Sequence, residues 1–251
     1  MSELEGIYII WLREVRRYMR ERAQVFSTIF MSLLWLIIFG AGIGSMRFGR
    51  MSENYQAFLF PGIIGMVLLV TSIRSGISII RDREFGFLRV ILIAPISRTS
   101  IVLGKTFGGG TVAVFQGTII LLLSFIVDVS LSPLTALYSI AIMILMALGL
   151  VCMGLVIASF LESFEGFNLI MSLLIMPMFF LSGALFPIHV LPAWLKNLTY
   201  INPLTYGVDG LRTTILGISA FSLQVDLTVL VCFAFLMLGI ATKTFERRVV
   251  H

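Results

Sequence analysis

Few side chains in this sequence have the type and spacing that chemistry needs. The tripeptide Gly104-Lys105-Thr106 looks like the end of a phosphate-binding loop. Such a loop also needs a strand before it and a glycine five residues before Gly104. Position 99 is Thr99, and the segment before it contains Pro95. We therefore predict that this chain does not bind a nucleotide.

Metal and acid–base sites are equally poorly supported. Cys152 and Cys232 lie inside apolar runs, and His189 and His251 have no metal-ligand spacing to them or to each other. The acidic residues that border apolar runs lie away from the middle of the runs, where ion-coupled carriers keep their ionisable groups. We expect no catalytic residue, no metal and no cofactor on this chain, so it is predicted not to be an enzyme.

A charged segment, residues 81–105, lies between two long apolar runs. An unpaired ion costs about 3 kcal/mol or more in the hydrocarbon of a bilayer. The segment must therefore lie at a membrane face. In a helix over 84–93, Phe85 and Leu88 fall near one face while Glu84 and Arg89 flank it. A helix that exposes apolar and charged side chains together is suited to docking on a partner protein.

The composition indicates a membrane protein. The 251 residues are 59% hydrophobic and 12% charged, and their mean hydropathy is +1.04. A soluble domain is about a quarter charged. The net charge of +5 does not indicate nucleic acid, because the cations cluster between apolar runs instead of covering one surface. We predict an all-α polytopic membrane protein.

The apolar runs predict one transmembrane domain, residues 1–251, with six spans. Their expected ranges are 25–45, 58–80, 107–127, 134–160, 167–185 and 223–242. Residues 3–22 have the pattern of an amphipathic helix in the membrane interface, and 187–212 are broken by prolines into pieces too short to span. We expect the latter to form two re-entrant helices at the outer face. In the interfacial helix, Trp11 would lie at headgroup depth and Arg13, Arg16 and Arg17 would face anionic lipid.

Lysine and arginine fix the expected orientation. They concentrate in the N-terminal segment, in residues 81–105 and in the tail, so the positive-inside rule places these parts and both termini in the cytoplasm. The connection between the fourth and fifth spans is also cytoplasmic by alternation, although it carries no cation. The segment 81–105 is therefore expected to be a cytoplasmic coupling region.

Two stretches resemble the ABC-2 permeases, the membrane subunits of ATP-binding-cassette exporters. The first is similar to that family's Arg-Glu-x-Gly motif with its following Pro-Ser-Arg and Gly-Lys pairs; here it reads Arg81-Asp82-Arg83-Glu84-Phe85-Gly86-Phe87-Leu88-Arg89, then Ala94-Pro95-Ile96-Ser97-Arg98 and Gly104-Lys105. The second covers 181–212 and contains Pro187, Trp194, Asn202, Pro203, Tyr206, Asp209 and Arg212. Within the family, these motifs are most similar to those of daunorubicin-resistance exporters. After the motif glycine, however, this chain has Phe87-Leu88-Arg89 where many relatives have Thr-Leu-Glu.

This resemblance implies a fold, partners and a location. It implies the six-span ABC-2 exporter fold, with an N-terminal interface helix, a coupling helix from Glu84 to Pro95 and outer re-entrant helices. It also implies a homodimer, or a pair with a sister permease, in the plasma membrane of a prokaryote. A separate ABC ATPase would bind the ATP and contact residues 81–89 and Pro95, and spans one, two and five would line the substrate route.

Three functions follow from these observations. The first is the permease of an ATP-driven exporter for a hydrophobic or amphipathic molecule, such as a drug or a lipid-like compound, because spans one and five are rich in Met, Phe, Leu and Ile. The second is export of a lipid-linked glycan or polysaccharide, which would require more aromatic and polar residues along the route. The third is an ion-coupled carrier or a membrane scaffold. Co-purification of an ATPase separates the third from the first two.

Overall fold

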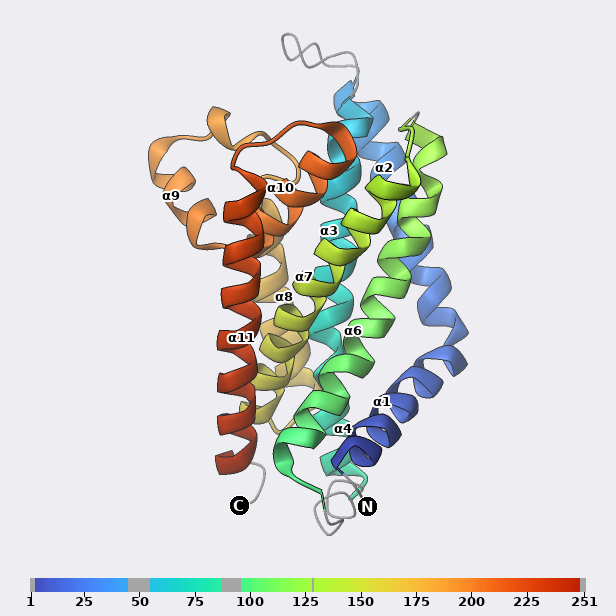
Figure 1. The fold of residues 1–251 in the computed structure, drawn as a ribbon, viewed down its shortest axis with the longest axis vertical. Helices are drawn as coiled ribbons and strands as arrows, with labels where there is room; N and C mark the ends of the chain where they lie inside the picture. The colour runs from blue at the N-terminus through green and yellow to red at the C-terminus, as the bar shows by residue number, and fades with distance from the viewer. Residues whose placement is uncertain (1–2, 45–54, 87–95, 128, 249–251) are drawn as a thin grey trace.

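The computed structural model describes residues 3–44, 55–86, 96–127 and 129–248, and every regular element within these ranges is a helix. The helices run roughly alongside one another in a bundle (Figure 1). In chain order they are α1 (Glu3–Arg20), α2 (Arg22–Gly44), α3 (Tyr55–Ser75), α4 (Ile77–Glu84), α6 (Arg98–Leu122), the 3-10 helix η2 (Leu123–Val127), α7 (Pro133–Phe160), α8 (Phe164–Phe180), the 3-10 helix η3 (Ile188–Val190), α9 (Ala193–Ile201), α10 (Pro203–Leu216) and α11 (Leu223–Arg248).

Within the described residues, four segments are long and apolar enough to cross a membrane: Tyr55–Glu84, Arg98–Val127, Pro133–Phe160 and Leu223–Arg247. A fifth crossing is possible in length if α1 and residues 25–38 of α2 count together, but these two helices meet at 68°. The helix α8 is apolar but has 17 residues, fewer than the roughly 20 that a helix needs to cross hydrocarbon. The structure thus describes four or five spans where the sequence predicts six.

The bounds differ from the expected spans where local capping decides them. The helix α6 begins at Arg98 and not at residue 107, because the Ser97 side chain accepts a hydrogen bond from the Ser100 backbone N–H and caps it. The helix α7 follows the expected span closely, because Ser132 caps its first turn and Pro133 occupies the first helical position. The second apolar run extends to Glu84 through α4.

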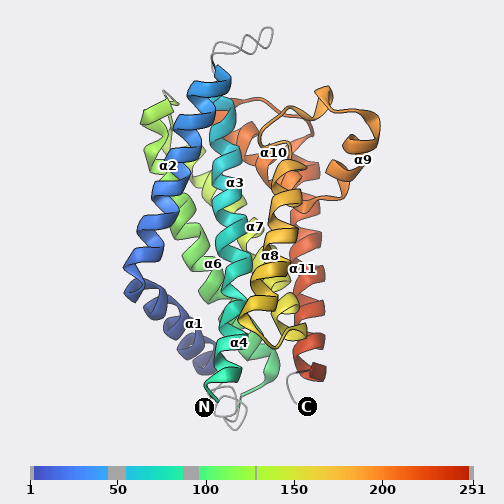
Figure 2. The same ribbon diagram turned by 180° about the vertical axis from the view of Figure 1, so that it is seen from behind.

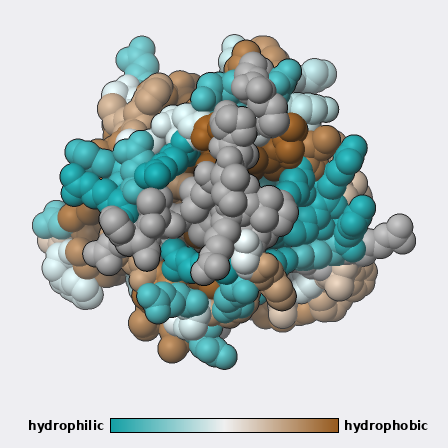
Figure 3. All heavy atoms as spheres, turned by 90° about the horizontal axis from the view of Figure 1, so that it is seen from below, coloured by the Kyte–Doolittle hydropathy of each residue, from teal (hydrophilic) through white to brown (hydrophobic). Residues whose placement is uncertain are grey.

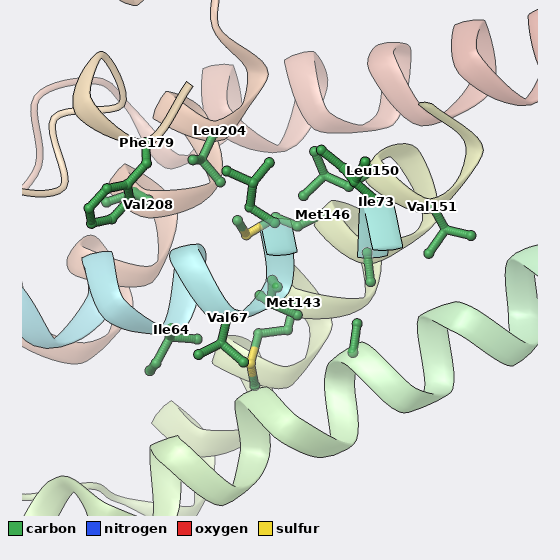
Figure 4. Packing of buried hydrophobic residues seen from close by; sticks show 14 of the residues in the cluster. Ile64, Val67, Ile73, Met143, Met146, Leu150, Val151, Phe179, Leu204 and Val208 are labelled. Carbon is green, nitrogen blue, oxygen red and sulfur yellow. The ribbon is translucent and has the colours of Figure 1, made fainter. Parts of the chain in front are cut away.

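The helix α3 lies at the centre of the bundle. It contacts α2, α6, α7 and α10, and nearly all of its residues from Ala57 to Ile73 are buried. Figure 4 shows Ile64, Val67 and Ile73 of this helix packed with methionines and aliphatic side chains from α7 and α10. Because so many apolar side chains are enclosed by neighbouring helices, α3 is a protein core element as well as a span.

The helix is interrupted at Gly76, between α3 and α4, where the backbone lies against that of α7. A Cβ built on Gly76 would strike the Gly154 carbonyl group, and a Cβ on Gly154 would strike the Ile73 backbone. Small residues allow this close approach of helices inside a membrane domain. The α3–α4 junction is therefore fixed against α7 by backbone contact.

The two ends of the bundle differ in character. We call the end where α1 begins and α11 ends the terminal end; α9 and α10 lie at the opposite end (Figures 1 and 2). Seen from the terminal end, hydrophilic residues gather around the face (Figure 3). The expected interfacial helix, 3–22, corresponds to α1, and the expected re-entrant segment, 187–212, contains η3, α9 and most of α10.

Candidate functional site

A buried cluster of charges joins α1, α4 and α6 at the terminal end. We call this cluster the junction and define it by Arg13, Glu14, Ser78, Asp82 and Lys105. The Lys105 ammonium donates hydrogen bonds to Asp82 Oδ2 at 2.6 Å, to Ser78 Oγ at 3.0 Å and to Glu14 Oε1 at 3.2 Å. Arg13 donates to the other Asp82 oxygen. Lys105 is 2% and Asp82 5% exposed, so their charges are compensated by each other and not by water.

Helix geometry brings these groups together. Ser78 and Asp82 are four residues apart in α4 and therefore share a face. In α6, Gly104 and Gly108 share the face toward α1: a Cβ on Gly104 would lie 2.8 Å from Ile10 Cβ, and one on Gly108 would lie 2.6 Å from Glu14 Cβ. These two glycines let α1 approach closely enough for Glu14 to reach Lys105.

A second contact fastens the beginning of α1 to the beginning of α6. The Glu3 carboxylate accepts hydrogen bonds from the Ser97 backbone N–H, at 3.0 and 3.1 Å, and from the Ser100 hydroxyl at 2.6 Å. The Ser100 hydroxyl and then the Ser97 N–H lower the pKa of Glu3 below its ordinary value. An anion at a helix N-terminus is also favoured by the helix dipole.

A third contact lies further along α1. Tyr18 accepts a hydrogen bond from the side-chain amide of Gln116 in α6, and the Gln116 carbonyl oxygen accepts one from Thr71 in α3. Trp11 donates to the Thr111 hydroxyl at 3.0 Å. Gln116 is 1% exposed, so its amide would be costly to bury without these partners. Together with the junction, these contacts hold α1 to the bundle along its length.

Beyond the junction, α4 ends in an exposed apolar side chain. Gly86 has φ +70°, the left-handed conformation that glycine adopts without strain, and its N–H donates to the Arg83 carbonyl. Phe85 is 78% exposed and Glu84 is also exposed. Arg83 donates to the Leu161 carbonyl at 3.1 Å. A large apolar side chain is therefore presented to solvent directly beside the junction.

At the opposite end, polar side chains hold the loops around α10. Asn202 accepts from the Leu204 N–H at 3.1 Å and donates to the Met178 carbonyl at 2.6 Å. Asp209 accepts from the Ala220 and Phe221 N–H groups at 2.8–3.0 Å. Arg212 donates to the Gly183 carbonyl at 3.0 Å, and its guanidinium lies 4.0 Å from the centroid of the Phe58 ring. The hydrogen bonds satisfy backbone N–H and carbonyl groups that lie in loops or at helix ends.

The comparison with known proteins agrees with this architecture. A family model described as "ABC-2 type transporter" matches residues 5–216. The chain belongs to this family. The match begins in α1, contains the junction and ends in α10. The chain is thus a membrane protein of the ABC-2 transport permease type.

Curated relatives of this ABC-2 permease are named as transport proteins or by a biological process. A "putative transport permease ycf38" of Pyropia yezoensis is 34% identical, covering 84% of this chain and 74% of the relative. The "inner membrane transport permease YadH" of Escherichia coli K12 is 29% identical, covering 89% of this chain and 88% of the relative. "Nodulation protein J" of Rhizobium meliloti is 28% identical, with 90% and 87% covered.

The structure separates the coupling candidates of the ABC-2 permease into three groups. Asp82 is buried in the junction, and Arg81 and Arg83 are half-buried and engaged within the chain, Arg81 with Glu21 at 3.2 Å. Glu84, Phe85 and Gly86 are exposed. The remaining candidates, Phe87, Leu88, Arg89 and Pro95, and with them most of the expected coupling helix, lie outside the described residues.

The other candidates have distinct surroundings. In α1, Arg13 pairs with Asp82 and Arg17 lies 3.6 Å from Glu14, whereas Arg16 is exposed. The candidates of the re-entrant segment also differ in exposure. Trp194 is 68% exposed, Pro187 precedes η3, Pro203 opens α10, and Tyr206 donates to the Tyr200 carbonyl at 2.8 Å.

Sequence reasoning did not identify the partners of the junction. In the sequence, Lys105 belongs to a tripeptide that looks like the end of a phosphate-binding loop. In the structure, its ammonium is bound by Asp82 and Glu14. The sequence places Asp226 at the boundary of an apolar run but gives no sign of its burial: at the start of α11 it is a fully buried carboxylate whose oxygens have no hydrogen-bond partner in the described part of the chain. A signal existed for Lys105, because an isolated cation at the edge of an apolar run needs a partner.

Proposed function

We propose that this chain is the membrane subunit of an ATP-driven exporter. It moves a hydrophobic or amphipathic molecule, drug or lipid-like, out of the cytoplasm with energy from a separate ABC ATPase. Two copies, or one copy and a sister permease, enclose the route. The family assignment supports the transport role, and the relative named as an inner membrane permease supports a location in the plasma membrane of a prokaryote.

The junction is the observation that carries the proposal. The ATPase docks at the terminal end, which is cytoplasmic, and contacts the exposed Glu84–Phe85 pair. Asp82 precedes Glu84 by two residues in α4, and its carboxylate is bound to Arg13 of α1 and Lys105 of α6. A displacement of the end of α4 therefore moves three helices together, because a buried ion pair cannot separate cheaply.

Phe85→Ala tests the docking role. We expect the variant to insert and fold normally, because Phe85 is exposed, and to lose either ATPase co-purification or the coupling of hydrolysis to export. Glu84→Lys should act in the same direction by reversing a charge. Phe125→Ala is the matched control, since Phe125 is 70% exposed in η2 at the opposite end. Unchanged ATPase binding and transport in Phe85→Ala would refute the proposal.

A further inference from the structure

A polar cavity of about 390 Å³ lies beside the junction, where α1 and α2 meet. Its walls come from α1, α2, α3, α4, α6 and α8, and most of its lining groups can form hydrogen bonds. Its charged lining residues are the cations Arg17, Arg74 and Arg81 and the acids Glu14 and Glu21. We call this space the elbow pocket. Its contributing residues lie near the terminal-end turns of α2, α3 and α8, which is the level of the lipid headgroups under the proposed orientation.

Arg74 distinguishes the elbow pocket from an ordinary polar crevice. It lies in the last turn of α3, within a membrane-spanning segment, and its side chain lines the pocket. Within the described part of the chain, no hydrogen bond or ion pair engages its guanidinium, whereas Arg81 is paired with Glu21 and Arg17 with Glu14. Arg74 is exposed at the terminal-end turn of α3, so its guanidinium is accessible to a ligand.

The charge balance around the pocket favours an anion. The lining of the elbow pocket holds three cations, Arg17, Arg74 and Arg81, against two anions, Glu14 and Glu21. The adjoining junction adds two cations, Arg13 and Lys105, against Asp82. Glu14 is shared between Arg17 and Lys105, so its charge is already compensated. A guanidinium with hydroxyl and amide groups nearby is the donor set that binds a phosphate group.

The surroundings favour an anion that carries an apolar tail. On α2, Phe26 and Phe30 flank the lining residue Ser27, and their stacked rings are both exposed. On α8, Leu169 and Leu173 follow the lining residue Asn168 and are exposed as well. A polar, cationic pocket bordered by exposed apolar helix faces matches a molecule with a charged head and a hydrocarbon tail.

We propose that the elbow pocket binds the phosphate head of an anionic amphiphile from the cytoplasmic leaflet, with Arg74 as its principal ligand. This inference rests on the proposed exporter function in one respect, because it names such amphiphiles as the class of molecule that the exporter moves. Arg74 donates a bidentate hydrogen bond to the phosphate, the hydroxyl and amide groups of the pocket complete its coordination, and the tail lies against α2 and α8.

The test measures binding to the purified full chain in a neutral detergent. Short-chain phosphatidylglycerol is the probe. Short-chain phosphatidylcholine is the control lipid whose head group has no net charge, and glycerol 3-phosphate is the control anion that has no hydrocarbon tail. We expect Arg74→Gln to weaken phosphatidylglycerol binding about tenfold, because the charge-assisted hydrogen bonds from the guanidinium to the phosphate are lost. Arg16→Gln, which removes an exposed arginine of α1 outside the pocket, should leave binding unchanged.

Each alternative result overturns a defined part of the proposal. Equal weakening in Arg74→Gln and Arg16→Gln would mean general attraction to a basic surface. Equal binding of phosphatidylcholine would remove the role of charge, and equal binding of glycerol 3-phosphate would replace the amphiphile with a soluble anion. Phe85→Ala leaves the pocket intact, so loss of ATPase coupling in that variant is distinguishable from loss of binding.

A second measurement addresses the cargo class. In the complex with the co-purified ATPase, phosphatidylglycerol should stimulate ATP hydrolysis, and Arg74→Gln should shift the stimulation to about tenfold higher lipid concentration. Arg16→Gln should keep the response of the unmodified protein. Binding without any stimulation would assign the pocket to a resident lipid and overturn the cargo assignment.

Discussion

Replacing Lys105 with methionine should destabilise the protein by about 3 kcal/mol, the lower part of the range for breaking a buried ion pair. Methionine has a similar length but no charge and no hydrogen-bond donor. The variant removes the ammonium that binds Asp82, Glu14 and Ser78 in a place where Lys105 itself is 2% exposed. Two carboxylates would then share less positive charge in a nearly dry site.

The magnitude is at the lower end because neither carboxylate is left alone. Asp82 keeps its bond to Arg13, and Glu14 keeps Arg17 at 3.6 Å. The arginine side chains are 29% exposed, so water screens part of their attraction, whereas the Asp82 side chain is 6% exposed. Lys105 is therefore more deeply buried than these arginines, and its ammonium is the charge that holds α4 to α6.

Arg81→Gln is the matched control. Arg81 also bridges two helices, pairing with Glu21 at 3.2 Å, but the two side chains are 34% and 38% exposed. Exposed pairs contribute about 0–1 kcal/mol. The assay is the free energy of unfolding in mixed micelles, followed by helical circular dichroism, for both variants under identical conditions.

A double variant separates the ion pair from other effects of the methionine. Asp82→Asn with Lys105→Met should be less destabilised than the two single variants added together, by about 1–3 kcal/mol. Additive losses, or equal losses in Lys105→Met and Arg81→Gln, would refute the reasoning that burial makes this cluster strong.

Three further predictions concern other positions. Gly108→Ala should lower the unfolding midpoint, since overpacking costs about 1–3 kcal/mol and its Cβ would lie 2.6 Å from Glu14 Cβ, whereas Gly110→Ala should be neutral or stabilising because its nearest neighbour would be at 3.7 Å. Asp209→Asn should destabilise by about 1–3 kcal/mol by losing charge-assisted bonds to loop N–H groups, while Asp226→Leu should not destabilise, a contrast that thermal unfolding checks. Because the pKa of Glu3 is lowered, its hydrogen bonds contribute their full stability above the ordinary glutamate pKa of about 4.3, and this stability is lost as pH falls through the lowered value. The hydrogen-exchange protection factors at the start of α6, which are corrected for the intrinsic pH dependence of exchange, should therefore be constant near neutral pH and fall in acid, and Glu3→Gln should lose this acid step.

The long helices were predictable because their signals are local. A helix that crosses a bilayer needs about 20 apolar residues in sequence, so α7 was expected over 134–160 and is observed over Pro133–Phe160. The helical character of residues 3–22 followed equally from the spacing of their apolar residues. The break at Gly76 was not predicted, because a single glycine in an apolar run has no distinct signal until its neighbour Gly154 is known.

The junction could not be predicted because its contacts are distant in sequence. Arg13 and Asp82 are 69 residues apart, and Lys105 and Glu14 are 91 residues apart. The sequence shows that these charges border apolar runs, but only the packing of α1 against α6 decides which charges meet. Asp82 illustrates the difference: its place in a motif led us to expect contact with a partner protein, and the structure places it among the charges of its own chain.

The burial of α3 has a consequence for biogenesis. Helices enter the membrane in chain order, so α3 arrives before α6, α7 and α10, which cover most of its surface in the folded protein. Until α10, which ends at Leu216, has been synthesised, the part of α3 around Gly65 that packs against α10 lacks its protein partner. The folded core is thus completed only when the C-terminal part of the chain is in the membrane, and nascent chains stalled before α7 should be preferred substrates for membrane proteases.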